Sequence, residues 1–270
     1  MNTVPSAANI HIVKACNRRC MFCFATDIDK GTMPVEDWVP IFEELKVAGV
    51  KKVNFVGGEP MLYPDLKRAC RICSEMGFIV TIVSNGSLIE DRDLLWMKDA
   101  GVKCLGLSID SVFERTEVLL GRSVEGFDHM AHVIEISDLA HSMGIDIKLN
   151  ITVVNQSMDE DFAPLIRRVD PQRCKVFRVL GLSNVNREGY LRCRVTDAQF
   201  QRFKERHQDV VLSNGKRIVF EDNDDMMGSY LMLDPQGMVL DNSTGMLIRH
   251  TLEEYLADPE NVTSMEKFLG

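Results

Sequence analysis

The sequence predicts an α/β fold, namely a partial (βα)6 barrel followed by a C-terminal α+β extension. Short apolar runs alternate with longer segments of helical periodicity through the first two-thirds of the 270 residues. The segments AGVKKVNF, MGFIVTI, AGVKCLGL and MGIDIKLNI share one form, in which a glycine that ends a helix is followed closely by a strand. Such repetition is typical of a parallel sheet with right-handed crossovers.

The order of these elements can be read along the chain. Strands are expected at residues 10–13, 52–56, 78–84, 103–109, 145–153 and 175–180. The helices between them are expected at residues 35–48, 63–76, 88–100, 127–143 and 159–169. Six such units are fewer than the eight of a closed barrel, so the barrel formed by residues 1–182 should be open.

The pattern changes in residues 183–270, which we expect to pack on the barrel, close it and contact the bound ligand. A Thr-x-x-Gln signature predicts a capped helix at residues 196–208. Further elements are expected as strands at 217–220 and 229–233, a turn at 234–237 and a short helix near 252–256.

Composition and net charge limit the classes of protein to which the chain can belong. Hydrophobic residues make up 45% and charged residues 26%, which is typical of a globular protein. The net charge of −9 argues against nucleic-acid binding, which needs a basic surface. We see no signal peptide and no apolar stretch long enough for a membrane span. The eight cysteines are therefore expected to be reduced, in a cytoplasmic protein that we expect to be a monomer.

Three cysteines directly follow the first strand. In CNRRCMFCF, Cys16, Cys20 and Cys23 lie at spacings of four and three residues, a compact set of thiolates of the kind that holds iron–sulfur clusters. Three ligands leave one iron of a four-iron cluster open for chemistry. A zinc site is the alternative; it would need a fourth ligand, for which His11 is available within the strand.

This spacing, with Phe22 before the last cysteine, resembles that of the radical S-adenosylmethionine (SAM) superfamily. Matching segments end the next three strands: GGEP at 57–60, SNGS at 84–87 and SID at 108–110. The resemblance implies a [4Fe–4S] cluster on Cys16, Cys20 and Cys23, SAM as second cofactor, and an external one-electron donor. It places the active site at the carboxyl ends of the strands, as in other barrel enzymes.

Side chains alternate between two faces along a barrel strand, so polar residues between apolar neighbours should point into the lumen. In KKVNFV, Val53 and Phe55 are expected to face the helices. In RCKVFRV the faces are less distinct, because Arg178 interrupts the apolar one. The alternation directs these side chains inward: Lys52, Asn54, Lys148, Asn150, Arg173 and Lys175.

Four cations in one lumen would repel one another unless an anion with several charges bound there, and a triphosphate fits best. The alternative is that lysines at strand starts, such as Lys52 and Lys175, extend to solvent. Lys148 lies mid-strand between apolar neighbours, which favours the anion site.

The segments CNRRCMFCF, NFVGGEP, IVSNGSLI, IDSVFE, LLGR, KLNITVVN, CKVFRVL and SYLMLD follow one another between residues 9 and 240. In this order they resemble the viperin-like family of antiviral radical SAM enzymes. The resemblance implies a nucleotide dehydratase, a lyase that converts a nucleoside triphosphate to its 3′-deoxy-3′,4′-didehydro form. A 5′-deoxyadenosyl radical from SAM would remove the C4′ hydrogen, after which the 3′-hydroxyl would leave as water with the uptake of one electron and one proton.

The resemblance also implies residue roles. The SAM-contacting positions are Phe22, Gly57, Gly58, Glu59, Ser84, Asn85, Ser108, Asp110 and Arg122. The nucleotide positions are Lys52, Asn54, Lys148, Asn150, Arg173, Lys175 and Tyr230. Tyr230 is also expected to be catalytic, as a donor of a proton or hydrogen, although a half-buried strand tyrosine is an equal alternative.

Some positions depart from the animal pattern. Val56 stands where the animal members have serine, and the segment EDNDDMMG differs near the expected base site. The resemblance therefore does not decide which nucleotide is the substrate; CTP, UTP and GTP are alternatives, and a pyrimidine is favoured. The alternatives in function are a GTP cyclase-like radical SAM enzyme, which would need a second set of cysteines, and a non-catalytic iron–sulfur protein.

Overall fold

The computed structural model describes residues 4–25, 31–264 and 267, and its strands form one sheet of ten. The sheet order is β10-β9-β8-β1-β2-β3-β4-β5-β6-β7. The strands are β1 (Ala7–Val13), β2 (Lys52–Gly57), β3 (Ile79–Ser84), β4 (Val102–Ser108), β5 (Asp146–Val153), β6 (Arg173–Arg178), β7 (Val219–Glu221), β8 (Leu231–Leu233), β9 (Val239–Asp241) and β10 (Ile248–His250).

The predicted parallel sheet is confirmed. Strands β1 to β6 lie side by side in chain order, and each pair is parallel. The C-terminal region adds a parallel strand at each side, because β7 pairs with β6 and β8 pairs with β1. Strands β9 and β10 continue antiparallel beyond β8. The sheet ends at β7 and β10, so it stays open.

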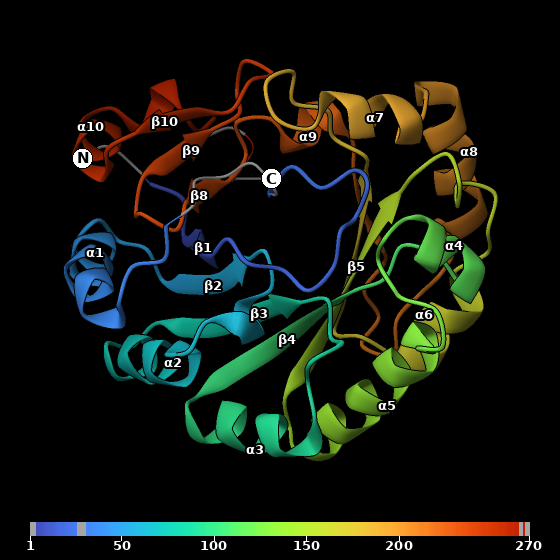
Figure 1. Cartoon of the computed structure of the whole chain (residues 1–270), viewed down its shortest axis with the longest axis horizontal. Coiled ribbons are helices and arrows are strands. Elements are labelled where there is room, and N and C mark those ends of the chain that lie inside the picture. Colours follow the sequence, from blue (N-terminus) through green and yellow to red (C-terminus); the bar gives the residue numbers. More distant parts are fainter. Residues whose placement is uncertain (1–3, 26–30, 265–266, 268–270) are drawn as a thin grey trace.

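Helices cover the outer face of this curved sheet (Figure 1). The helices of the described residues are α1 (Val35–Val47), α2 (Leu66–Glu75), α3 (Asp91–Asp99), α4 (Glu114–Leu119), α5 (His129–Ser142), α6 (Ala163–Val169), α7 (Arg187–Cys193), α8 (Asp197–His207), α9 (Asn223–Met226) and α10 (Leu252–Ala257). In α1, Trp38, Phe42 and Leu45 repeat at helical spacing and are fully buried. They form with Phe55 of β2 part of the core between helices and sheet.

The five barrel helices α1, α2, α3, α5 and α6 were predicted, but α2, α3 and α6 begin three or four residues later than expected, at Leu66, Asp91 and Ala163. Pro60–Leu62 forms a 3₁₀ turn, so α2 begins at Leu66 rather than at residue 63. Thr196 and Gln199 form the predicted capping box of α8. The short helices α4, α7 and α9 were not predicted, because four to seven residues carry too little periodicity. Within the described residues, no helix has the length and apolarity of a membrane span.

Candidate active site

A cavity of about 330 Å³ lies at the carboxyl ends of the parallel strands. It brings together most of the predicted site residues: Phe22, Cys23, Asn54, Gly57, Gly58, Ser84, Asn85, Ser108, Arg122, Lys148, Asn150, Lys175 and Tyr230. Six others lie outside this lining: Cys16, Cys20, Lys52, Glu59, Asp110 and Arg173. The predicted edge of the sheet is therefore where the polar groups gather.

The predicted alternation is seen in the middle of β2 and β5, whereas Lys52 and Arg173, the first residues of β2 and β6, lie outside the cavity lining. Val53 and Phe55 are fully buried against the helices, whereas Asn54 faces the cavity. In β5, Leu149 is buried between Lys148 and Asn150, which both face the cavity. Strand β6 contributes Lys175 and Phe177, and Arg178 at its end also reaches the lining.

The cations lie side by side across β5 and β6. Their parallel register places Lys148 next to Arg173 and Asn150 next to Lys175. Burial, together with the charges of Lys175, Arg173 and Lys52, lowers the pKa of the Lys148 ammonium to about 7. Burial also lowers the pKa of Lys52. The repulsion among these cations destabilises the folded protein, and a bound anion would relieve that repulsion.

Glu221 is a site residue that the sequence analysis missed. Its carboxylate forms an ion pair with Lys175 and accepts a hydrogen bond from the Tyr230 hydroxyl. Lys175 Nζ also donates to that hydroxyl at 2.8 Å. Lys175 therefore already has an anionic partner, unlike the prediction that all four cations await the substrate. Glu221 ends β7, one residue beyond the strand predicted at 217–220.

Cys16, Cys20 and Cys23 lie on the loop after β1, and all three are reduced and partly accessible. Cys70 and Cys73 are instead fully buried in the core, which is where helical cysteines usually lie. A second cavity, of about 430 Å³, lies between Cys20, Cys23 and residues 183–189. Cys23 lines both cavities and Cys20 lines the second one, and this space beside the cysteine loop fits a group larger than a single ion, as a four-iron cluster is. Within the described ranges no three His, Cys, Asp or Glu side chains converge as a single-ion site requires.

Neighbouring segments hold this cysteine loop in place. The Arg19 amide donates to the Gly121 carbonyl at 3.0 Å, and the Met21 amide donates to the Leu120 carbonyl at 2.8 Å. On the other side, Asn186 Nδ2 donates to the Phe22 carbonyl at 2.9 Å. The loop thus arises where β1 ends and is fixed by the segments after α4 and before α7.

The glycines of GGEP have a structural reason that the sequence did not reveal. A Cβ atom on Gly57 would lie 2.5 Å from the Val13 carbonyl oxygen, and one on Gly58 would lie 2.2 Å from that of Lys14. Any side chain there would push the start of the cysteine loop away. Both glycines also face the main cavity, where the family pattern expects SAM.

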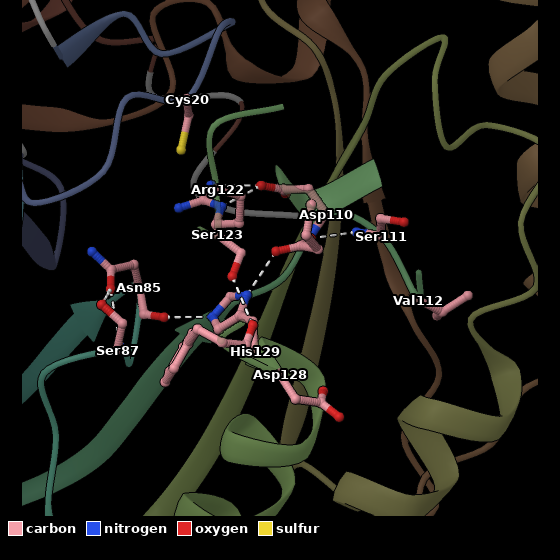
Figure 2. A network of polar contacts seen from close by, with 12 residues as sticks. Cys20, Asn85, Ser87, Asp110, Ser111, Val112, Arg122, Ser123, Asp128 and His129 are labelled. Atoms are coloured by element: carbon pink, nitrogen blue, oxygen red, sulfur yellow. Dashed lines mark hydrogen bonds and ion pairs between the residues drawn. The ribbon is translucent and has the colours of Figure 1, made fainter. Parts of the chain in front are cut away.

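Glu59 and Asp110 are buried supports rather than lining residues. Glu59 is fully buried and accepts hydrogen bonds from Ser84 Oγ at 2.7 Å and from the Asn85 amide at 2.8 Å. Asp110 is paired with Arg122 at 2.6 Å and accepts from the Thr152 amide at 2.8 Å. Figure 2 shows Arg122 and Asp110 between Cys20 and His129. Glu59 and Asp110 therefore fix residues that do line the cavity.

Comparison with known proteins agrees with this geometry. The profile of the Radical SAM superfamily matches residues 10–169. A protein of Thermoplasmatales archaeon (strain ISO4-H5), named S-adenosylmethionine-dependent nucleotide dehydratase, is 46% identical over 231 residues, which cover 86% of this chain and 81% of that protein. A Danio rerio protein named S-adenosylmethionine-dependent nucleotide dehydratase RSAD2 is 33% identical over 90% of this chain and 69% of its own length.

A solved structure supports the fold alone. The Streptococcus suis protein SuiB bound to S-adenosylmethionine aligns with a TM-score of 0.74 at 18% identity. The alignment covers 97% of this chain and 67% of that one. The open sheet and its helices are thus those of a known architecture.

Proposed function

The chain belongs to the S-adenosylmethionine-dependent nucleotide dehydratases of the radical SAM superfamily, and from this premise we propose that its substrate is a pyrimidine nucleoside triphosphate, CTP or UTP. The product would be the 3′-deoxy-3′,4′-didehydro nucleotide, with a role in antiviral defence. The observation that carries the proposal is that Lys148 lines the cavity with Lys175, while the charges of Arg173 and Lys52 lie close enough to lower its pKa. The pyrimidine follows the resemblance to the animal members.

Cys16, Cys20 and Cys23 would hold the [4Fe–4S] cluster. When bound and reduced, the cluster supplies the electron that cleaves SAM to methionine and the 5′-deoxyadenosyl radical needed for removal of the C4′ hydrogen. The residues of the chain itself bind and orient the two substrates around it. We propose that an external one-electron donor reduces it, and that the protein acts as a cytoplasmic monomer.

We assign the two ends of the cavity to different ligands. Gly57, Gly58 and Asn85, which adjoin the cysteine loop, would contact SAM with Phe22, Ser84, Ser108 and Arg122. Lys148, with Lys52 and Arg173 near it, would bind the triphosphate, because among the described residues no carboxylate pairs with these three as Glu221 does with Lys175. Asn54, Asn150, Lys175 and Tyr230 would bind the ribose. Residues 183–270 contribute Tyr230 and would thereby complete the nucleotide site made by residues 1–182.

The test is a product assay with four nucleotides. The cluster is reconstituted without oxygen, dithionite and SAM are added, and 5′-deoxyadenosine is measured with CTP, UTP, GTP and ATP. We expect a burst with CTP or UTP, together with a product lighter by one water. A burst with GTP alone would reject the pyrimidine, and equally slow cleavage with all four would reject a nucleotide triphosphate as substrate.

The cysteine assignment predicts the iron content of variants. Cys16→Ala, Cys20→Ala and Cys23→Ala should each lose most of the iron after reconstitution, because each removes one of three thiolate ligands. Cys104→Ser is the matched control, since Cys104 is also partly accessible but lies on β4. Iron and sulfide analysis checks this. Full iron content in any of the three alanine variants would contradict the assignment.

A further inference from the structure

A buried histidine and a buried glutamate lie beneath the SAM end of the cavity, and neither lines it. His129, at the start of α5, is 1% exposed, and Glu117, in α4, is also 1% exposed. His129 Nδ1 lies 2.7 Å from Glu117 Oε2. A pair of ionisable side chains this deeply buried is costly unless every polar atom has a partner.

Each side-chain nitrogen and oxygen of His129 and Glu117 has a hydrogen-bond partner. His129 Nε2 lies 2.8 Å from the Asn85 carbonyl oxygen, which can only accept, so this nitrogen carries a hydrogen. Glu117 Oε1 accepts from the amides of Asp110 and Ser111, both at 2.7 Å, as a carboxylate does. The 2.7 Å contact between Nδ1 and Oε2 needs one further hydrogen between these two atoms.

Two chains of contacts lead from this pair to the cysteine loop. The first runs through Asn85: His129 bonds its carbonyl, and its side-chain Nδ2 donates to Asn17 Oδ1, in the cysteine loop, at 2.9 Å. The second runs through Asp110: Glu117 accepts from its backbone amide, and its side-chain carboxylate is paired with Arg122 at 2.6 Å. Figure 2 shows His129 facing Asn85 on one side and the Asp110 segment on the other.

We propose that His129 and Glu117 are positioning residues, which join the ends of β3 and β4 and thereby set Asn85 and Arg122 in the geometry that SAM requires. The pair contacts both segments, because His129 bonds the Asn85 carbonyl after β3 and Glu117 bonds the Asp110 amide after β4. Glu59 supports the Asn85 side alone, and Asp110 supports the Arg122 side alone. Misplacing a ligand contact by a fraction of an ångström is costly, so the pair matters to SAM binding without touching SAM.

The experiment measures SAM affinity with no nucleotide present. The dissociation constant of SAM is determined by calorimetry on the reconstituted protein, and the EPR spectrum of the reduced cluster is recorded with and without SAM. His129→Gln can replace only one of the two hydrogen bonds, and we expect it to weaken SAM binding about 10-fold or more, as is typical for partners that orient ligands. Glu117→Gln can keep every hydrogen bond to a neutral imidazole, so its affinity should stay within about 3-fold.

His207→Gln is the matched control. His207 is also fully buried and uses both ring nitrogens, since it accepts from the Phe162 amide at 3.0 Å and donates to the Phe203 carbonyl at 2.9 Å. It packs beside α6 and not at the SAM end, so His207→Gln should lower the melting temperature and leave SAM affinity unchanged.

Each result decides the proposal. Unchanged SAM affinity in His129→Gln, or an equal loss in His129→Gln and His207→Gln, would show that the pair only stabilises the fold. If His129→Gln is not recovered folded, Asp110→Asn tests the link to Arg122, and unchanged affinity there would overturn the proposal. The proposal rests on the SAM site of the proposed function. Because nucleotide is absent, its failure is distinguishable from that of the triphosphate assignment.

Discussion

Lys148→Met is expected to raise the KM for the nucleoside triphosphate by about 100-fold, while slow cleavage of SAM without nucleotide continues. A charged hydrogen bond to a buried anion contributes about 1.5–3 kcal/mol, and Lys148 is the cavity cation whose pKa is lowered to about 7. Methionine keeps the length of the chain but not its charge. Steady-state kinetics with 5′-deoxyadenosine and didehydro-nucleotide as readouts measure both effects.

The same substitution should stabilise the protein without its substrate. The pKa of Lys148 is lowered from 10.5 to about 7, so between these values the unfolded chain binds one more proton than the folded one. The free energy of unfolding therefore rises with pH across this window, and the destabilising contribution is fully present below about pH 7. In Lys148→Met that dependence should disappear, with higher stability at pH 6.5 than the parent protein. Urea unfolding at pH 6.5 and pH 9 checks the prediction.

Two variants control for this result. Lys148→Arg keeps its charge at every pH, so it should flatten the rise in KM that the parent protein shows as pH passes 7. Lys103→Met removes an exposed lysine from the neighbouring strand β4 and should change neither KM nor stability appreciably. An unaltered KM in Lys148→Met would mean that the triphosphate binds elsewhere.

Lys148 also shows why much of the site could be predicted from sequence. It lies between Ile147 and Leu149, and the period of a strand then leaves one direction for its side chain. The cysteines and the GGEP segment could be predicted equally well, because each is a short continuous stretch that follows a predictable strand. Strand order followed from the βα repetition.

The residues that were missed depend on distant parts of the chain. Glu221 reaches Lys175 across 46 positions and comes from a strand of three residues, too short to be aligned by pattern. His129 reads as one polar residue at the start of a helix, and only the fold brings the Asn85 carbonyl to it. Gly57 was expected as a SAM-contacting position, and only the fold shows that the Val13 carbonyl oxygen leaves no space for a Cβ atom there.

Tyr230→Phe is expected to lower kcat for the nucleotide product by about 100-fold or more, with little change in KM. Proton donation by a positioned side chain typically contributes about 10²–10⁴-fold. Burial and the Glu221 carboxylate both raise the pKa of Tyr230, so its phenol keeps the proton it would donate. Lys175 donates to the same oxygen at 2.8 Å, and its cation would stabilise the phenolate that remains.

The ratio of 5′-deoxyadenosine to didehydro-nucleotide separates this role from simple packing. If Tyr230 acts after SAM cleavage, Tyr230→Phe should still form 5′-deoxyadenosine while less of it leads to product, so the ratio rises. Tyr255→Phe is the matched control, because Tyr255 is also buried and its hydroxyl lies 3.0 Å from Thr263 Oγ1. It should leave the ratio at the parent value. Glu221→Gln keeps the hydrogen bond to Tyr230 but not the charge beside Lys175, so we expect an intermediate ratio. A ratio in Tyr230→Phe equal to that of the parent protein would show that Tyr230 serves only in packing.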